Sequence, residues 1–241
     1  MTDVVYEDNF SERQEAILSQ VVKNGFVTIE ALAAQFNVSA QTIRREIIEL
    51  SSRGRLQRFH GGAGPLDTTE SARLDYQTKR SLNQREKAIV GRKAASMIPD
   101  GATIYLDVGT TVEACAHDLT KRPGFTVFTN SMRSAMAFDP TEHNVFLLGG
   151  RMAGRDGSLI GDEIVQKLAD VHLDFSVIAC SGIDKDSRVM DFDMAKISIK
   201  RAAISVANKC FLVATHTKFN RTALVSIAHL DQFDEVITDT P

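Results

Sequence analysis

The stretch Asn37-Val-Ser-Ala-Gln-Thr-Ile-Arg-Arg-Glu-Ile-Ile-Glu-Leu50 decides how the amino-terminal part of the chain folds. Ser39 is a good N-cap, because its side-chain oxygen can accept a hydrogen bond from a free backbone N–H of the next turn. A helix is therefore predicted from about Ala40. At about 100° per residue, Ile43, Ile47 and Leu50 share one stripe, which is the pattern of a helix face that packs on a core.

The opposite face of this predicted helix carries Gln41, Arg44 and Arg45. These side chains suit base edges and phosphates, and they lie in the first turns, where a recognition helix contacts DNA. A solvated helix face with two arginines has the same pattern. The neighbouring segments must decide between these two interpretations.

The segments before this helix complete a helix-turn-helix pattern. Ser11 and Gln14 predict a capping box at the start of a first helix, which ends near Asn24-Gly25. Thr28 predicts the cap of a short second helix, and Asn37-Val38 predicts a tight turn into the third. Two helices, a turn and a third helix make a helix-turn-helix.

A short wing strand is predicted next, at Arg55-Leu-Gln-Arg-Phe-His60, ended by Gly61-Gly62. The alternation in this strand suits Arg58 and His60 near a DNA backbone. Four features in this order are far more specific than one helix. As a hypothesis, Gln41, Thr42 and Arg45 read bases, whereas Arg44, Arg58 and His60 hold phosphates.

Length and charge limit the remaining possibilities. With 241 residues and 43% hydrophobic content, the chain can bury one small and one medium core, so we expect two domains. The formal net charge is -3, so affinity for DNA must come from a local patch. Five arginines and two glutamates lie between residues 40 and 62, which leaves a local charge of +3 beside the predicted helix.

Cysteines and histidines argue against disulfides and metal. Cys115, Cys180 and Cys210 are odd in number and form no Cys-x-x-Cys pair, which favours reduced thiols in a cytoplasmic protein. The six histidines show no metal-ligand spacing. No apolar run approaches the roughly 18 residues of a membrane span, and the start of the chain does not resemble a signal peptide. We expect no metal, cofactor or membrane partner.

A second domain is predicted after a linker. We place the DNA-binding domain at residues 1–62, the linker at 63–84 and an α/β domain at 85–241, because Gly64-Pro65 and a mixed-charge run interrupt the pattern. Alternation of strands and helices then predicts a mostly parallel sheet with helices on both faces. The expected strands are Thr103–Leu106, Thr126–Phe128, Val145–Leu148, Phe175–Ala179, Phe211–Ala214 and Val236–Ile237.

The loops that follow these strands predict a ligand site, since such sheets bind ligands beyond the carboxyl ends of their strands. Asp107-Val-Gly-Thr-Thr111 opens a helix with free backbone N–H groups and two hydroxyls, which suits phosphate, although an ordinary β-α turn has a similar composition. Four small or polar loops at one edge favour a phosphorylated, hydroxyl-rich ligand. The candidate effector residues are Asp107, Gly109, Thr110, Thr111, Thr129, Asn130, Gly149, Gly150, Arg151, Gly182 and Lys218.

Gln41-Thr-Ile-Arg-Arg-Glu46 and Arg58-Phe-His-Gly-Gly-Ala63 resemble the winged helix-turn-helix of the DeoR family. The resemblance runs roughly from Arg13 to the end of the chain. It implies a transcriptional repressor that binds double-stranded operator DNA as a homodimer or homotetramer. It also implies a sensor domain similar to ribose-5-phosphate isomerase, which binds a phosphorylated sugar or polyol. Glycerol-3-phosphate is the favoured effector; another sugar phosphate, or activation in place of repression, is the alternative.

Three positions depart from the family pattern. Glu46 stands where the family usually has aspartate and keeps the charge. Lys196 stands where relatives carry glutamate, and Thr215 stands where they carry aspartate. The last two changes make the expected pocket less negative, which affects which anion or polyol it accepts.

A sugar-phosphate isomerase is the rival class. Such an enzyme needs a carboxylate base at the substrate carbons and a lysine that stabilises an enediolate. The sequence neighbours of Lys200 are Ile199 and Arg201, which supply no acid. A helix-turn-helix also has no purpose in a metabolic isomerase, so no catalytic residue is predicted.

Overall fold

In a computed structural model the chain divides into two compact units, Met1–Thr69 and Glu70–Pro241. The structure describes residues 10–24, 27–59, 62–64, 80, 82–153 and 156–240. Most of the predicted linker, residues 63–84, lies outside these ranges, and so does His60. The two units are described separately below.

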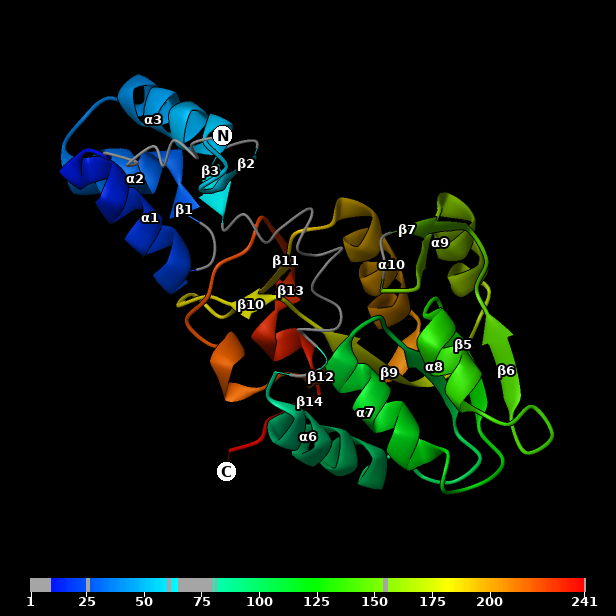
Figure 1. Cartoon of the computed structure of the whole chain (residues 1–241). Helices are drawn as coiled ribbons and strands as arrows, with labels where there is room; N and C mark the ends of the chain where they lie inside the picture. Colours follow the sequence, from blue (N-terminus) through cyan, green and yellow to red (C-terminus); the bar gives the residue numbers. More distant parts are fainter. Residues whose placement is uncertain are drawn as a thin grey trace, which may run out of the picture. The chain divides into compact units, whose positions relative to one another are not determined.

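Three helices form the framework of the amino-terminal unit: α1 (Glu12–Asn24), α2 (Ile29–Phe36) and α3 (Ala40–Ser52) (Figure 1). Their predicted caps are confirmed. Gln14 N donates to Ser11 Oγ at 3.2 Å and Ser11 N donates to Gln14 Oε1 at 3.0 Å, which completes the capping box. Ala31 N donates to Thr28 Oγ1, and Thr42 N donates to Ser39 Oγ, both at 3.1 Å.

A small antiparallel sheet closes this unit. It consists of β1 (Val27–Thr28), β2 (Gln57–Phe59) and β3 (Gly62–Gly64) in the order β1-β3-β2. The sequence predicted that Gly61-Gly62 ends the wing, but Ala63 and Gly64 continue it as β3. Ala63 is fully buried and packs with Ile43, Ile47 and Leu50 in one core, because a small residue fits between two neighbouring strands. The wing therefore extends past residue 62.

The carboxy-terminal unit is built on a six-stranded sheet in the order β14-β12-β9-β4-β5-β6 (Figure 1). Every neighbouring pair is parallel, as predicted. All six predicted strands are present: β4 (Thr103–Leu106), β5 (Thr126–Thr129), β6 (Asn144–Leu147), β9 (Leu173–Ala179), β12 (Ala207–Val213) and β14 (Glu235–Ile237).

Helices cover both faces of this sheet because alternate strand residues point to opposite sides. Ile104 and Leu106 pack with α6 (Gln84–Ser96) and α7 (Thr110–Leu119), whereas Tyr105 between them packs with α9 (Asp162–Ala169) and α10 (Met194–Ser205). The short helix α8 (Met132–Ala137) follows β5. Among the helices that the structure describes, none combines the length and the apolar character needed to span a bilayer.

Smaller elements gather around the large sheet. β7 (Arg151–Ala153) and β8 (Ser158–Ile160) form an antiparallel pair, which we call the β7–β8 hairpin. β10 (Gly182–Ile183), β11 (Arg188–Asp191) and β13 (Val225–His229) form a second small sheet. Two 3-10 helices, η2 (His216–Lys218) and η3 (Leu230–Gln232), follow β12 and β13. The three cysteines are free and buried, as predicted.

The strand order places a switch point between β4 and β9. The chain adds β5 and β6 on one side of β4, and then crosses to β9 on the other side and continues to β12 and β14. At such a point the connections leave in opposite directions, which opens a crevice at the carboxyl ends of the two strands. Asp107 follows β4 and Cys180 follows β9, so the predicted loops do meet at one edge of the sheet.

Gly91 marks the closest approach of α6 and α7. A Cβ at this position would lie 2.6 Å from both Ala114 C and Cys115 N, which is closer than real Cβ contacts. We expect Gly91→Ala to lower the free energy of unfolding by about 1 to 3 kcal/mol, because the helices must move apart. The measurement is urea unfolding of the full-length protein followed by circular dichroism.

Helix propensity alone predicts the opposite sign for this change, since alanine favours a helix over glycine by roughly 1 kcal/mol. Ala88→Gly on an exposed position of the same helix supplies the control for propensity. A Gly91→Ala protein that is more stable than the wild type would contradict the close approach.

Candidate functional site

Helix α3 presents a polar stripe to solvent. Gln41, Arg44 and Arg45 are exposed, and their side chains form neither hydrogen bonds nor ion pairs with any residue in the described ranges. The opposite stripe is buried. Thr42 lies between the two, half-buried, with its hydroxyl 2.9 Å from Ser39 Oγ. The side chains predicted to meet DNA are therefore available, except that the Thr42 hydroxyl is shared with the helix cap.

The two acids of α3 are bound within the unit. Arg13 of α1 donates from Nε to Glu46 Oε1 at 2.9 Å and Oε2 at 3.0 Å, and from Nη2 to Oε1 at 2.5 Å. Glu49 accepts from Gln14 Nε2 at 3.0 Å and from Arg53 Nη2 at 2.6 Å. These contacts pair both carboxylates with donors of the same unit. The Glu46 side chain is 12% exposed, whereas the Glu49 side chain remains 45% exposed.

Other arginines of the predicted basic patch differ in their surroundings. Arg53 and Arg55 lie over the ring of Phe10, at 5.5 Å and 5.3 Å from its centroid. They are engaged by their own unit and are weaker candidates for DNA contacts than the sequence count suggested. Arg58 on β2 is exposed, and its side chain makes no hydrogen bond or ion pair with the residues that the structure describes.

In the carboxy-terminal unit, a buried lysine lies between two carboxylates at the switch point. Lys200 of α10 pairs with Asp107 Oδ2, and its Nζ lies 3.5 Å from Asp191 Oδ2 and 2.9 Å from Ala179 O. Asp107 Oδ2 also accepts from Ala179 N at 3.0 Å. The side chains of Lys200 and Asp107 are each 2% exposed, so the contacts join β4, β9 and α10 inside the protein.

One ammonium shared between two acids explains their titration. Burial raises the pKa of Asp107, and the charge of Lys200 only partly opposes this. Burial also acts to raise the pKa of Asp191, but Lys200 and the hydroxyl of Ser181 outweigh it, and that pKa is lowered. Burial acts to lower the pKa of Lys200, but Asp107 and Asp191 outweigh it, and the pKa is raised. Lys200 is therefore a fixed cation at physiological pH.

The amino terminus of α7 lies beside this cluster. Gly109 adopts a φ of 149°, and a Cβ there would lie 3.2 Å from the Cβ of Ala179. Glycine at this position thus allows the turn between β4 and α7 to pack against the end of β9. Thr110 and Thr111 form the first turn of the helix, whose free backbone N–H groups carry positive partial charge. Phosphate is a suitable ligand for this combination of donors.

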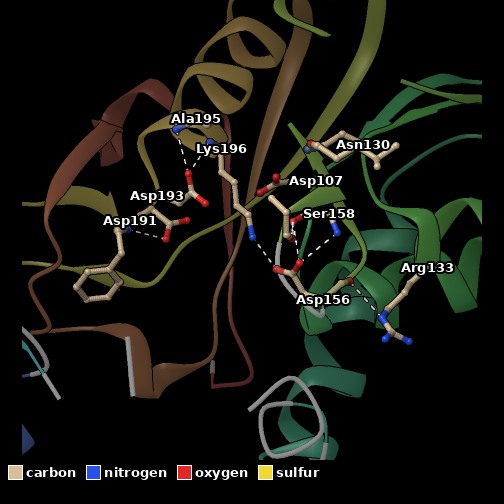
Figure 2. Close-up of polar contacts among 12 residues, drawn as sticks. Asp107, Asn130, Arg133, Asp156, Ser158, Asp191, Asp193, Ala195 and Lys196 are labelled. Atoms are coloured by element: carbon tan, nitrogen blue, oxygen red, sulfur yellow. Dashed lines mark hydrogen bonds and ion pairs between the residues drawn. The ribbon is translucent and has the colours of Figure 1, made fainter. Parts of the chain in front are cut away.

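The β7–β8 hairpin is tied to α10 by an ion pair. Figure 2 shows Lys196 reaching from α10 toward Asp156, and the two charged atoms lie 2.6 Å apart. Burial acts to raise the pKa of Asp156, but Lys196 and the hydrogen bonds from Ser158 lower it overall. Lys196 was expected to make the pocket less negative. Asp156 balances that charge locally, so the side chain also serves to position the hairpin.

Two predicted effector residues have side chains that are fully engaged in the protein. Thr129 Oγ1 donates to Leu106 O at 2.6 Å and accepts from Ser131 N at 3.0 Å. Asn130 Oδ1 accepts from Tyr105 at 2.8 Å, while its Nδ2 donates to Leu159 O at 2.9 Å. Both residues are buried, and these bonds hold the end of β5 against β4 and β8.

The remaining predicted residues lie at different places along the edge of the sheet. Gly149, Gly150 and the exposed Arg151 lie after β6, two strands away from β4, whereas Gly182 in β10 lies just after β9. Lys218 lies in η2, which follows β12. Burial raises the pKa of the Cys180 thiol to about 12, and Lys218 and Lys200 both act against that rise. Cys180 is thus within electrostatic reach of both lysines.

Comparison with known proteins agrees with this architecture. A model of the DeoR-like helix-turn-helix domain matches residues 13–69, and a model of the DeoR C terminal sensor domain matches residues 82–240. The chain belongs to the DeoR family. The DeoR resemblance of the sequence motifs is therefore confirmed.

Individual DeoR relatives cover nearly the whole chain. The glycerol-3-phosphate regulon repressor of Escherichia coli K12 is 34% identical over 96% of this chain and 91% of its own length. An L-fucose operon activator of Haemophilus influenzae is 29% identical over 94% and 91%. Both are named as regulators of transcription. Ribose 5-phosphate isomerase A of Methanocaldococcus jannaschii aligns over 57% of this chain and 55% of its own, at 15% identity and a TM-score of 0.41.

Lys200 has acidic neighbours, contrary to the prediction from the sequence. Ile199 and Arg201 supply none, but Asp107 and Asp191 reach this lysine from distant parts of the chain. The case against a sugar-phosphate isomerase therefore rests on membership of the DeoR family, whose relatives are named as regulators, and not on a lack of acids beside Lys200. A signal was present: Lys200 follows Ile197 by three residues on the face of α10 that is buried.

Lys200→Met removes the cation between Asp107 and Asp191. We expect the free energy of unfolding of this DeoR protein to fall by about 3 to 5 kcal/mol at neutral pH, because two buried acids lose their partner. The lowered pKa of Asp191 means that its contribution is present above the unfolded aspartate pKa of about 3.9 and is lost as the pH falls through the folded value. Because the pKa of Lys200 is raised, its contribution to folding stability is complete below the unfolded lysine pKa of about 10.4. This contribution is lost as the pH rises through the folded pKa.

Urea unfolding at a series of pH values measures this difference. The gap between wild type and variant should be widest between about pH 5 and 9 and should narrow in acid. Lys209→Met, at an exposed position of β12, is the control and should leave stability nearly unchanged. A gap that does not narrow in acid would show that the loss comes from packing and not from the paired charges.

Proposed function

We propose that this protein is a transcriptional repressor whose hold on operator DNA is released by a phosphorylated sugar or polyol, with glycerol-3-phosphate as the first candidate. The observation that carries the proposal is the Lys200 cluster at the switch point, where α7 offers its amino terminus. The similarity to the glycerol-3-phosphate regulon repressor supports this choice of ligand.

DNA is recognised by α3 and the wing in this proposal. Gln41, Thr42 and Arg45 read base edges, while Arg44, Arg58 and His60 contact phosphates and supply affinity without sequence information. The exposure of four of these side chains supports the assignment; Thr42 is half-buried and His60 is outside the described residues. The pairing of Glu46 with Arg13 supports it further, because a duplex repels unpaired carboxylates.

The effector binds across the switch point in this proposal. Its phosphate accepts hydrogen bonds from the N–H groups of Gly109, Thr110 and Thr111, and Lys200 and Lys218 supply positive charge. Its hydroxyls donate to the carboxylates of Asp107 and Asp191, which are good acceptors. Thr129 and Asn130 hold the site in shape, and the outer border comprises Gly149, Gly150, Arg151 and Gly182.

Repression requires two copies of the DNA-binding unit on one operator. We propose a homodimer or homotetramer that places two recognition helices on half-sites about one helical turn apart. Effector binding then changes how the subunits present their DNA-binding units. A coupling of about 1 to 3 kcal/mol is enough to change operator affinity roughly 5- to 150-fold.

Activation of transcription is the second candidate function, since a relative of similar coverage is named an L-fucose operon activator. The two candidates differ in the sign of one measurement. A reporter gene behind the operator should be expressed more strongly in a strain that lacks this protein if it represses, and more weakly if it activates.

Arg45 and Arg58 should differ in their effect on DNA binding. Arg45→Ala is expected to cost about 1 to 3 kcal/mol on the specific duplex and to relax specificity, because a base contact is lost. Arg58→Ala is expected to weaken binding to all duplexes and to flatten the salt dependence. Salt-titrated binding to specific and random DNA measures both effects. Equal losses on both kinds of DNA for both variants would contradict the division of roles.

Phosphorylated effectors should stabilise the full-length protein. A ligand present at about 100 times its dissociation constant adds about 2.7 kcal/mol of stability. We expect a thermal shift and operator release with glycerol-3-phosphate, and no shift with glycerol. Lys218→Met should reduce the thermal shift. Lys209→Met, near the start of β12 and away from the proposed site, should leave it unchanged. Absence of any shift with glycerol-3-phosphate would remove it as the effector and leave the rest of a sugar-phosphate panel to be tested.

A further inference from the structure

One apolar side chain lies in the middle of the polar stripe on α3. Ile48 is 48% exposed, while the other isoleucines of this helix, Ile43 and Ile47, are fully buried. Ile48 follows Arg45 by three residues and Arg44 by four, so all three share one helix face. The outward stripe is therefore made of an amide, two guanidinium groups and a branched hydrocarbon.

Within the described part of the chain, Ile48 belongs to no hydrophobic core. Core contacts of α3 are made by the opposite stripe, and Ile48 is not among the residues that pack against that core. Single exposed apolar residues are common and need no explanation by themselves. Here the position matters, because Ile48 lies beside Arg44 and Arg45, while the neighbouring acids Glu46 and Glu49 are paired with Arg13, Gln14 and Arg53. Ile48 therefore occupies the exposed face that carries the two arginines.

A duplex offers one apolar group to a helix in its major groove. The C5 methyl of thymine projects into that groove, and apolar side chains contact it, whereas the other base edges there present hydrogen-bond donors and acceptors. An isoleucine cannot make hydrogen bonds, so a methyl group is the base feature that suits it.

We propose that Ile48 contacts a thymine methyl group in the major groove and adds a preference for thymine to the bases read by its polar neighbours. This inference rests on the proposed DNA binding by α3. Burial of one methyl group, taken as about 0.8 kcal/mol, corresponds to about a fourfold change in affinity. Ile48 is thus a specificity-determining residue of modest strength.

The test uses the full-length protein and a duplex that this protein selects from a random DNA pool. Each thymine of the selected duplex is replaced in turn by deoxyuridine, which lacks only the methyl group. The wild type is expected to lose about fourfold in affinity at one thymine of each half-site. Ile48→Ala removes the contact from both half-sites, so it should bind the unmodified duplex roughly 15-fold more weakly, and it should be insensitive to deoxyuridine at that same position.

Matched variants keep the result specific to this side chain. Ile48→Val retains a branched hydrocarbon and should keep part of the sensitivity to deoxyuridine. Val22→Ala removes an equally branched and more exposed side chain from α1, and it should change neither affinity nor sensitivity. Because Ile48 lies outside the core, circular dichroism should show all three variants folded as the wild type.

Two outcomes overturn the inference, and they are distinguishable from each other. If the wild type binds a selected duplex but no thymine is sensitive to deoxyuridine, or if Ile48→Ala keeps the full sensitivity, then Ile48 reads no methyl group while the proposed DNA binding stands. If the protein selects no duplex from the pool, then the proposed function fails together with this inference.

Discussion

The fold of the larger unit depends on a buried, charged lysine, Lys200. Lys200 is charged and buried, and this is tolerable only because Asp107 and Asp191 meet it from two other segments. The contacts fix the ends of β4 and β9 relative to α10, at the point where the strand order reverses. The buried ammonium thus holds three segments together at the sheet edge where the effector site is proposed.

The smaller unit solves a related electrostatic problem at its surface. A helix that approaches DNA must show cations, yet α3 also carries Glu46 and Glu49. Side chains of α1 and Arg53 donate hydrogen bonds to these two carboxylates. Gln41, Arg44 and Arg45 remain as the polar stripe. The same arrangement leaves Ile48 as the apolar member of that stripe.

Much of this architecture could be predicted from the sequence, because local signals were strong. Ser39 and Thr28 are caps whose chemistry acts over a few residues, and each predicted strand is an apolar run with a clear end. β3 was missed because glycines at 62 and 64 resemble a linker, although Ala63 is buried between two strands. The partners of Lys200 were missed because Asp107 lies 93 residues away in sequence, and such pairing leaves no local pattern. Asn130 is typical of a ligand-binding loop, but its side-chain amide is hydrogen-bonded to Tyr105 and to Leu159 O.

The fork between Arg13 and Glu46 has one more consequence. The acids of α3 find their partners within the amino-terminal unit, so neither carboxylate needs a cation from the carboxy-terminal unit. The amino-terminal unit can therefore be joined to a different sensor unit without leaving either carboxylate unpaired. Exchange of the sensor unit would thus leave the pairing of these acids on α3, the helix that we propose to bind DNA, unchanged.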